Sequence, residues 1–141
     1  MPNHNIKVVI DTNVWISGLV FGGIPRIILQ QFIDKKINII ISEEIITELH
    51  RTITRKFPLF QANMELLELS IRKDATLVPL GSLTVKISRD HDDNKVIETA
   101  VIGNVDYIIS GDDDLLSITQ YRNIQIIKPA EFLNISNSYF H

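Results

Sequence analysis

The stretch Val8-Val9-Ile10-Asp11-Thr12-Asn13 decides the fold, because an uninterrupted apolar run ends here in three polar residues. Residues 107–112, Tyr-Ile-Ile-Ser-Gly-Asp, have the same form. Runs that are apolar on both faces are typical of buried parallel strands, whose carboxyl ends carry the ligand site of such a sheet. We therefore expect Asp11 and Asp112 to lie close together on one edge of a sheet.

The remaining apolar patterns predict an alternation of strands and helices. We expect strands at 6–11, 38–41, 76–80, 106–110 and 124–128, and helices at 13–21, 24–36, 43–57, 60–73, 92–103 and 113–119, with a short helical turn and a polar tail after Pro129. This alternation predicts an α/β fold with a central, mainly parallel sheet covered on both faces. Neither a linker nor a repeat divides the sequence, so we expect residues 1–141 to form one domain.

Composition restricts the chemistry. The 141 residues include no cysteine and have a net charge of −3. Metal ligands must therefore be oxygen or imidazole, and any nucleic-acid binding must rely on local basic side chains. The chain begins without the pattern of a signal peptide, and no apolar window reaches the length of a membrane span. We expect a cytoplasmic protein with no membrane association.

Asp11 and Glu48 differ in how strongly the sequence supports a functional role. Asp11 could cap the following helix, but Thr12 or Asn13 can cap it equally well and leave Asp11 free to act in a site. Glu48 lies on its helix about 110° from the centre of the apolar stripe, which is compatible with an ordinary surface glutamate. Arg51 and Arg55 fall on its side of the helix, where they could meet phosphate.

Two further acidic groups occur later in the chain. Asp93 is in helical register with apolar residues of the 92–103 segment, so its carboxylate leaves from the core-facing side and requires a partner. Asp90 or Asp92 can cap that helix, and capping also explains one of Asp112 and Asp114. Several converging carboxylates repel one another by roughly 1 kcal/mol per pair in water and roughly 4 kcal/mol at an effective dielectric near 20. Hard divalent cations such as Mg²⁺ or Mn²⁺ would relieve this repulsion and act on phosphates.

At these positions the sequence resembles the PIN-domain family of metal-dependent nucleases, in particular the VapC-type toxins of toxin–antitoxin pairs. The similarity rests on four segments: Ile10-Asp11-Thr12-Asn13-Val14, the helix start at Ser42 that runs to Glu48-Leu49, Asp90-His91-Asp92-Asp93-Asn94-Lys95, and Ser110-Gly111-Asp112-Asp113-Asp114-Leu115. The resemblance covers about residues 6–132.

The resemblance implies a three-layer α/β/α sandwich and hydrolysis of RNA with one or two Mg²⁺ or Mn²⁺ ions. It assigns the metal and the catalysis to Asp11, Glu48, Asp93 and Asp112, with Asn13, Ser110 and Asp114 in supporting positions. Arg51, Arg55 and Lys95 are candidates for holding the RNA backbone. If the protein is a toxin of this kind, we also expect a cognate antitoxin as its partner.

A homodimer is a separate expectation. The helices at 24–36 and 60–73 are richer in apolar residues than one sheet face requires, and the excess includes Ile27, Ile28, Phe32, Leu66, Leu67 and Leu69. Large apolar patches on a protein surface often mark a partner interface.

Three alternatives to the toxin reading remain. A PIN nuclease can process RNA without being a toxin. A small-molecule phosphohydrolase of the haloacid-dehalogenase type would use Asp11 as a nucleophile, but it expects an aspartate two residues later, where this chain has Asn13. A binding module with a decayed site would not need all four acidic positions filled. Trapping a phospho-aspartate at Asp11 would favour the phosphohydrolase, and absence of metal binding would favour the binding module.

Overall fold

β1 (Ile6–Ile10) lies inside a mainly parallel sheet, because its apolar residues are buried on both faces. The computed structural model describes residues 5–81 and 91–139, apart from the side chains of His91 and Asp92. Within this part of the chain, six strands follow the order β3-β2-β1-β4-β6-β5. The other strands are β2 (Ile37–Ile41), β3 (Thr76–Leu77), β4 (Tyr107–Ile109), β5 (Gln120–Tyr121) and β6 (Ile124–Ile127).

The strand order changes direction beside β1. The chain proceeds from β1 to β2 and β3 on one side, then crosses over to β4 and β6 on the other. β1 pairs in parallel with both β2 and β4, and Ile10 is in register with Ile109. The carboxyl ends of β1 and β4 therefore lie next to each other. In open α/β sheets, such a switch point is where ligands bind.

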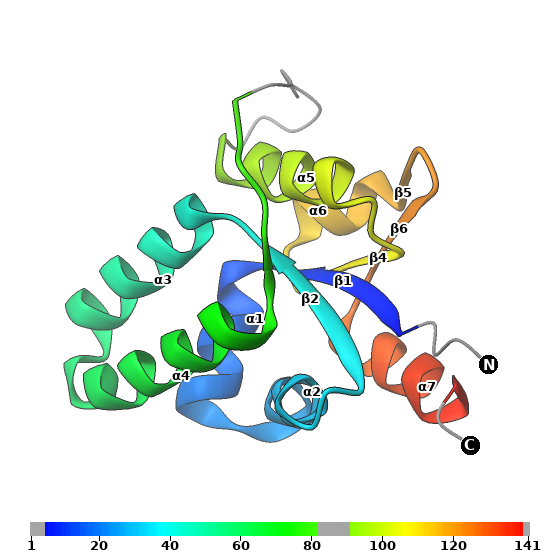
Figure 1. Ribbon diagram of the computed structural model, residues 1–141. Coiled ribbons are helices and arrows are strands. Elements are labelled where there is room, and N and C mark those ends of the chain that lie inside the picture. The colour runs from blue at the N-terminus through cyan, green and yellow to red at the C-terminus, as the bar shows by residue number, and fades with distance from the viewer. Residues whose placement is uncertain (1–4, 82–90, 140–141) are drawn as a thin grey trace.

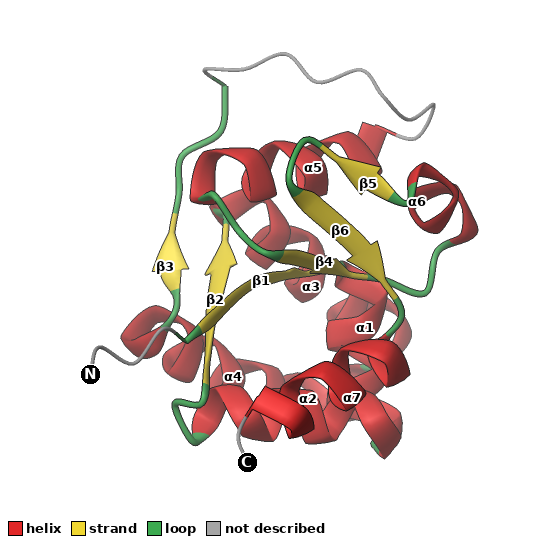
Figure 2. Cartoon of the chain, turned by 90° about the vertical axis from the view of Figure 1, so that its right-hand side faces the viewer, coloured by secondary structure: helices red, strands yellow, loops and turns green. Residues whose placement is uncertain are grey.

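Helices form layers on both faces of the sheet, as expected (Figures 1 and 2). α5 (His91–Gly103) and α6 (Asp113–Ile118) cover one face, and α1 (Thr12–Ile16), α2 (Gly23–Ile33) and α7 (Pro129–Tyr139) lie on the other. α1 continues as a π-helical turn over Ser17–Phe21. α3 (Glu43–Lys56) and α4 (Gln61–Asp74) pack side by side through the 3-10 turn Pro58–Phe60. The α/β/α sandwich is confirmed.

Two predicted elements differ from the structure, and one observed strand was not predicted. The strand predicted at 76–80 pairs only over Thr76–Leu77, and the short antiparallel strand β5 was not predicted. The predicted polar tail after Pro129 is wrong, because this segment forms the helix α7. Phe132 and Ser136 of α7 are fully buried, and the Gln31 side-chain amide of α2 donates to the Ser136 hydroxyl at 3.0 Å. α7 therefore belongs to the layer that contains α2.

The core agrees with the apolar patterns only in part. Trp15 is fully buried and packs edge-on against Phe32, with ring centroids 6.4 Å apart. Of the residues expected on an apolar surface, Ile28, Phe32 and Leu67 are instead buried in the core. Ile27, Leu66 and Leu69 are exposed, by 48%, 65% and 67%. The exposed apolar area on α2 and α4 is thus smaller than the sequence suggested.

In the described part of the chain, no single helix has both the length and the hydropathy to cross a bilayer. Thr12–Phe21 and Gly23–Ile33 meet the criterion only when joined, and they are bent by 98° relative to each other.

Candidate functional site

Asp11 lies at the carboxyl end of β1 and is 7% exposed. Its carboxylate does not cap α1. Instead the buried hydroxyl of Ser110, at the end of β4, donates to Asp11 Oδ2 at 2.9 Å. The same hydroxyl accepts the backbone N–H of Asp112 at 3.0 Å. Ser110 therefore links the Asp11 carboxylate to the turn that carries Asp112.

Burial raises the pKa of Asp11 from 3.8 to about 6. Hydrogen bonds from Ser110 and from the Thr12 backbone oppose this rise, and the negative charges of Asp112 and Glu48 add to it. Both of those carboxylates are thus close enough to act on Asp11 electrostatically. An ionised Asp11 is costly in the metal-free protein, because it is poorly solvated and repelled by its neighbours.

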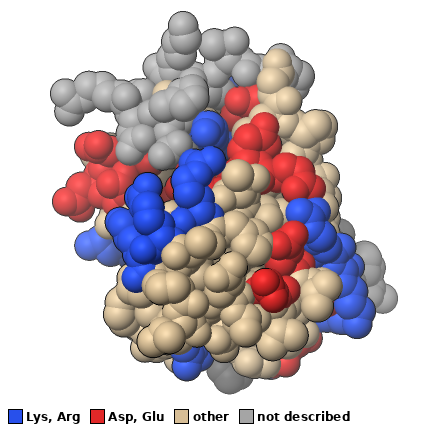
Figure 3. Space-filling view, turned by 90° about the vertical axis from the view of Figure 1, so that its left-hand side faces the viewer, with Lys and Arg blue, Asp and Glu red and all other residues tan. Residues whose placement is uncertain are grey.

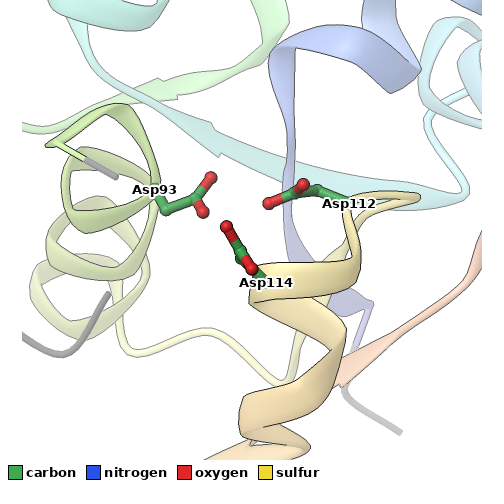
Figure 4. A group of neighbouring side chains, drawn as sticks. All are labelled: Asp93, Asp112 and Asp114. Carbon is green, nitrogen blue, oxygen red and sulfur yellow. The ribbon is translucent and has the colours of Figure 1, made fainter. Parts of the chain in front are cut away.

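Three aspartates converge beside Asp11. Oxygens of Asp93, Asp112 and Asp114 all lie within 4.8 Å of one another. The three side chains point toward a common space, Asp93 from α5 and the other two from the start of α6 (Figure 4). Asp93 is buried, whereas Asp114 is exposed. Asp112 Oδ2 also accepts the Leu115 N–H at 3.4 Å and so caps α6. The donor set consists of carboxylate oxygens, which suits Mg²⁺ or Mn²⁺.

The predicted site residues occupy two zones around this point. The 4.8 Å group contains Asp93 and Asp112, and it also contains Asp114, which the sequence placed in a supporting position. Asp11 and Glu48 lie outside that group, and the charges of Asp112 and Glu48 both act on Asp11. Asp90 and the side chain of Asp92 lie outside the described residues.

A pair of buried hydroxyls connects the helices that carry Glu48 and Asp93. Ser42 caps α3 by accepting the Ile45 N–H at 3.3 Å, and its oxygen lies 3.3 Å from the hydroxyl oxygen of Thr99 on α5. Thr99 donates to the backbone carbonyl of Lys95 at 2.7 Å. Because the single Thr99 proton is used there, the Ser42 hydroxyl donates to Thr99. Both side chains are fully buried, so the contact fixes α3 against α5.

Two hollows adjoin the carboxylates, and they differ in charge. The larger, of about 520 Å³, we name the α1–α6 hollow; it is lined by Asn13, Val14 and Ser17 of α1, by residues 111–114, and by Pro129. The smaller, of about 240 Å³, we name the α3–α5 hollow; it is lined by Glu43, Glu44, Thr47, Glu48, Arg51 and Lys95. Only the second includes basic side chains among its described lining residues. Arg55 lies further along α3 and is exposed.

An ion-pair network lies between α3 and α4, on the face of the molecule that Figure 3 presents. Arg72 of α4 makes a two-pronged contact with the Glu43 carboxylate at 2.8 and 2.9 Å, and its Nε donates to Glu68 at 2.7 Å. His50 contacts the other oxygen of Glu68. Arg72 holds the pKa values of both glutamates below their usual range. This network neutralises Glu43, which also lines the α3–α5 hollow.

Four residues of the site region have roles that the sequence did not indicate. Ser42 was expected only as a helix start and not as a link to α5, and Thr99 was not considered at all. Ser17 and Asp113 line the α1–α6 hollow. Helical spacing could have identified Ser17, because it lies four residues after Asn13, on the same side of the first helix. Thr99 follows Lys95 by the same interval.

Comparison with known proteins agrees with this geometry. Residues 7–114 match the family model of the PIN domain. An uncharacterized protein of Methanocaldococcus jannaschii, MJ1680, is 34% identical over 145 residues, which cover 94% of this chain and 93% of that protein. The crystal structure of VapBC2 from Rickettsia felis, bound to a DNA fragment from its promoter, contains a similar fold. That match has a TM-score of 0.60 at 9% identity and covers 87% of this chain and 98% of the other.

Proposed function

This chain belongs to the PIN-domain family, and on that premise we propose that it is a metal-dependent endoribonuclease and the toxin of a toxin–antitoxin pair. The observation that carries the proposal is the convergence of Asp93, Asp112 and Asp114 within 4.8 Å, beside a buried Asp11. Such a group of carboxylates is electrostatically unfavourable on its own, and binding of a divalent cation by a nuclease would relieve the repulsion.

The residues present fit one or two Mg²⁺ or Mn²⁺ ions. Asp93, Asp112 and Asp114 offer oxygens at a spacing that one ion can span, and Asp11 and Glu48 add charge from the side. When bound, a divalent cation supplies activation of water and charge stabilisation for in-line displacement at phosphorus. The direct contact of Asp114 is part of this proposal and extends the supporting role expected from the sequence.

The neighbouring residues orient this group. The Ser110 hydroxyl holds Oδ2 of Asp11 in place at the end of β1. The Ser42–Thr99 contact sets the position of α3, and with it Glu48, relative to the α5 helix that carries Asp93. Asn13 is exposed at the start of α1 and lines the α1–α6 hollow, where its amide can hold substrate or water.

Basic side chains on α3 and α5 would hold the RNA backbone. Arg51 and Lys95 line the hollow that contains Glu48, and Arg55 continues the same helix by about one further turn. Figure 3 presents groups of Lys and Arg side chains on the face where α3 and α4 lie. Lys and Arg contacts to phosphate provide affinity that is independent of sequence and falls with salt.

Two protein partners complete the proposal. We propose a homodimer through the exposed apolar side chains of α2 and α4, which include Ile27, Leu66 and Leu69. The fold is shared with a VapBC2 structure, which supports an antitoxin as a second partner. Light scattering at micromolar concentration tests self-association, and co-expression with the product of an adjacent small gene tests the antitoxin. If neither partner is found, RNA processing without a toxin role becomes the better reading.

RNA cleavage by the purified protein tests the activity. We expect degradation of single-stranded RNA with Mn²⁺ or Mg²⁺, no degradation with chelator, and loss of activity in Asp93→Asn. Asp34→Asn serves as the matched control, because Asp34 is an exposed aspartate at the end of α2, away from the group. Equal cleavage in chelator, or equal loss in both variants, would refute the proposal.

A further inference from the structure

The two hollows beside the carboxylates differ in whether they can bind the phosphate group of a nucleotide. The α3–α5 hollow contains Arg51 and Lys95 as well as three glutamates, of which Glu43 is paired with Arg72, so a phosphate can lie against its two basic side chains. The described lining of the α1–α6 hollow contains no Lys or Arg, while Asp112, Asp113 and Asp114 all face it. A phosphate in that space would be repelled, since a bound cation between the carboxylates neutralises Asp112 and Asp114 but not Asp113.

The α1–α6 hollow has the size and the walls of a site for a flat organic group. Its volume of about 520 Å³ lies within the roughly 300–1,000 Å³ typical of small-ligand sites. Val14 and the half-buried ring of Pro129 provide apolar wall, and Asn13 and Ser17 provide polar groups on one side. Sequence-specific RNA proteins hold unstacked single-stranded bases against flat side chains and bind the base edges by hydrogen bonds. Here the Pro129 ring and Val14 would provide the wall, and the polar side chains the hydrogen bonds.

We infer that the α1–α6 hollow binds the nucleobase next to the cleaved bond, and that Asp113 selects bases that carry an exocyclic amino group. This inference rests on the proposed nuclease function and adds a specificity-determining residue to it. The Asp113 carboxylate is exposed and is not a member of the 4.8 Å group, so it remains available to a substrate.

The selection follows from the hydrogen-bonding groups of the bases. An ionised carboxylate accepts hydrogen bonds and donates none, so it pairs with the amino groups of adenine, cytosine or guanine. Uracil presents two carbonyl oxygens on either side of its single N–H, and the carboxylate repels them. Asp113 therefore favours the amino bases, whereas the phosphate contacts of Arg51 and Lys95 are indifferent to the base.

The test uses end-labelled oligo(A), oligo(C) and oligo(U) of equal length, which avoids the need to know the cleavage position. Cleavage rates are measured with Mn²⁺ for the wild type, Asp113→Asn and the control Asp34→Asn. We expect the wild type and the control to cleave oligo(A) and oligo(C) about tenfold faster than oligo(U), or more. Asp113→Asn should bring the three rates within about threefold by slowing the first two, because its amide both donates and accepts.

A binding measurement separates this inference from the nuclease proposal. The same oligonucleotides are titrated onto the Asp11→Asn variant, with and without Asp113→Asn. If nothing is cleaved but binding prefers oligo(A) and oligo(C) through Asp113, the base site stands and the nuclease proposal fails. If the wild type cleaves all three equally, or Asp113→Asn slows all three equally, the nuclease stands and the base site is refuted. Absence of both cleavage and preference refutes both.

Discussion

Replacing Asp11 by asparagine separates two effects of this carboxylate: it destabilises the metal-free fold, and it contributes to metal binding. The substitution keeps the shape of the side chain, and the asparagine carbonyl can still accept the hydrogen bond from Ser110. It removes the negative charge that burial and the neighbouring acidic groups disfavour. The variant should therefore be as stable as the wild type without metal, or more stable.

The magnitude follows from the pKa. A carboxyl whose pKa is raised from 3.8 to about 6 by folding contributes stability that is present below the lower value and lost as the pH rises through about 6. The full loss is roughly 3 kcal/mol. At pH 7.5 in chelator, Asp11→Asn should gain up to that amount over the wild type, and the gain should shrink as the pH is lowered toward 4.

Urea unfolding measures both the stability difference between the two proteins and their stabilisation by metal. The experiment is run at several pH values, with chelator and with excess Mn²⁺. The wild type should gain about 2.7 kcal/mol at a hundredfold excess of metal over Kd, and the variant clearly less. If Asp11 only supports the helix start, the variant will instead be less stable in chelator and will keep the full metal increment. That pattern would remove Asp11 from the site.

Three further predictions concern other parts of the molecule. Gly103→Ala should lower the free energy of unfolding by about 1–3 kcal/mol, because the new Cβ would lie 2.4 Å from Ile40 Cγ2 in the core. Gly111→Ala is the matched control and should change the free energy of unfolding little, because its new Cβ would have no atom within 4 Å. Arg72→Ala should make the melting temperature less dependent on pH below 4.5, since the lowered pKa values of Glu43 and Glu68 contribute stability that is lost on acidification. If the melting temperature of the variant falls with pH as it does in the wild type, the ion-pair network is contradicted. Arg51→Ala should weaken RNA binding and reduce the salt slope by about one, while Arg122→Ala, on the turn before β6, should leave both unchanged.

The sequence predicted the elements whose signals are local. β1 and β4 are runs of apolar residues that are buried on both faces, and their polar ends meet because parallel strands align. Asp93 was recognised as core-facing from its register with Val96, Ile97 and Ala100, and the structure buries all four. The alternation of these elements was sufficient to predict an α/β fold with a mainly parallel sheet.

The features that the sequence did not predict depend on distant contacts. α7 contains several polar residues, and its buried Ser136 accepts a hydrogen bond from Gln31, 105 residues earlier. β5 has two residues and exists through its pairing with β6, between backbone positions of positive φ at Thr119 and Arg122. The approach of Asp114 to Asp93 depends on how α6 is placed relative to α5, which no local pattern encodes.

Direct titration with Mn²⁺ tests the central claim, that this group of carboxylates is a divalent-cation site. Calorimetry on the metal-free wild type should give saturable binding of one or two ions per chain. Asp93→Asn and Asp112→Asn should weaken that binding strongly, whereas Asp34→Asn should bind as the wild type does. No saturable binding by the wild type, or binding that both site variants retain in full, would contradict the account.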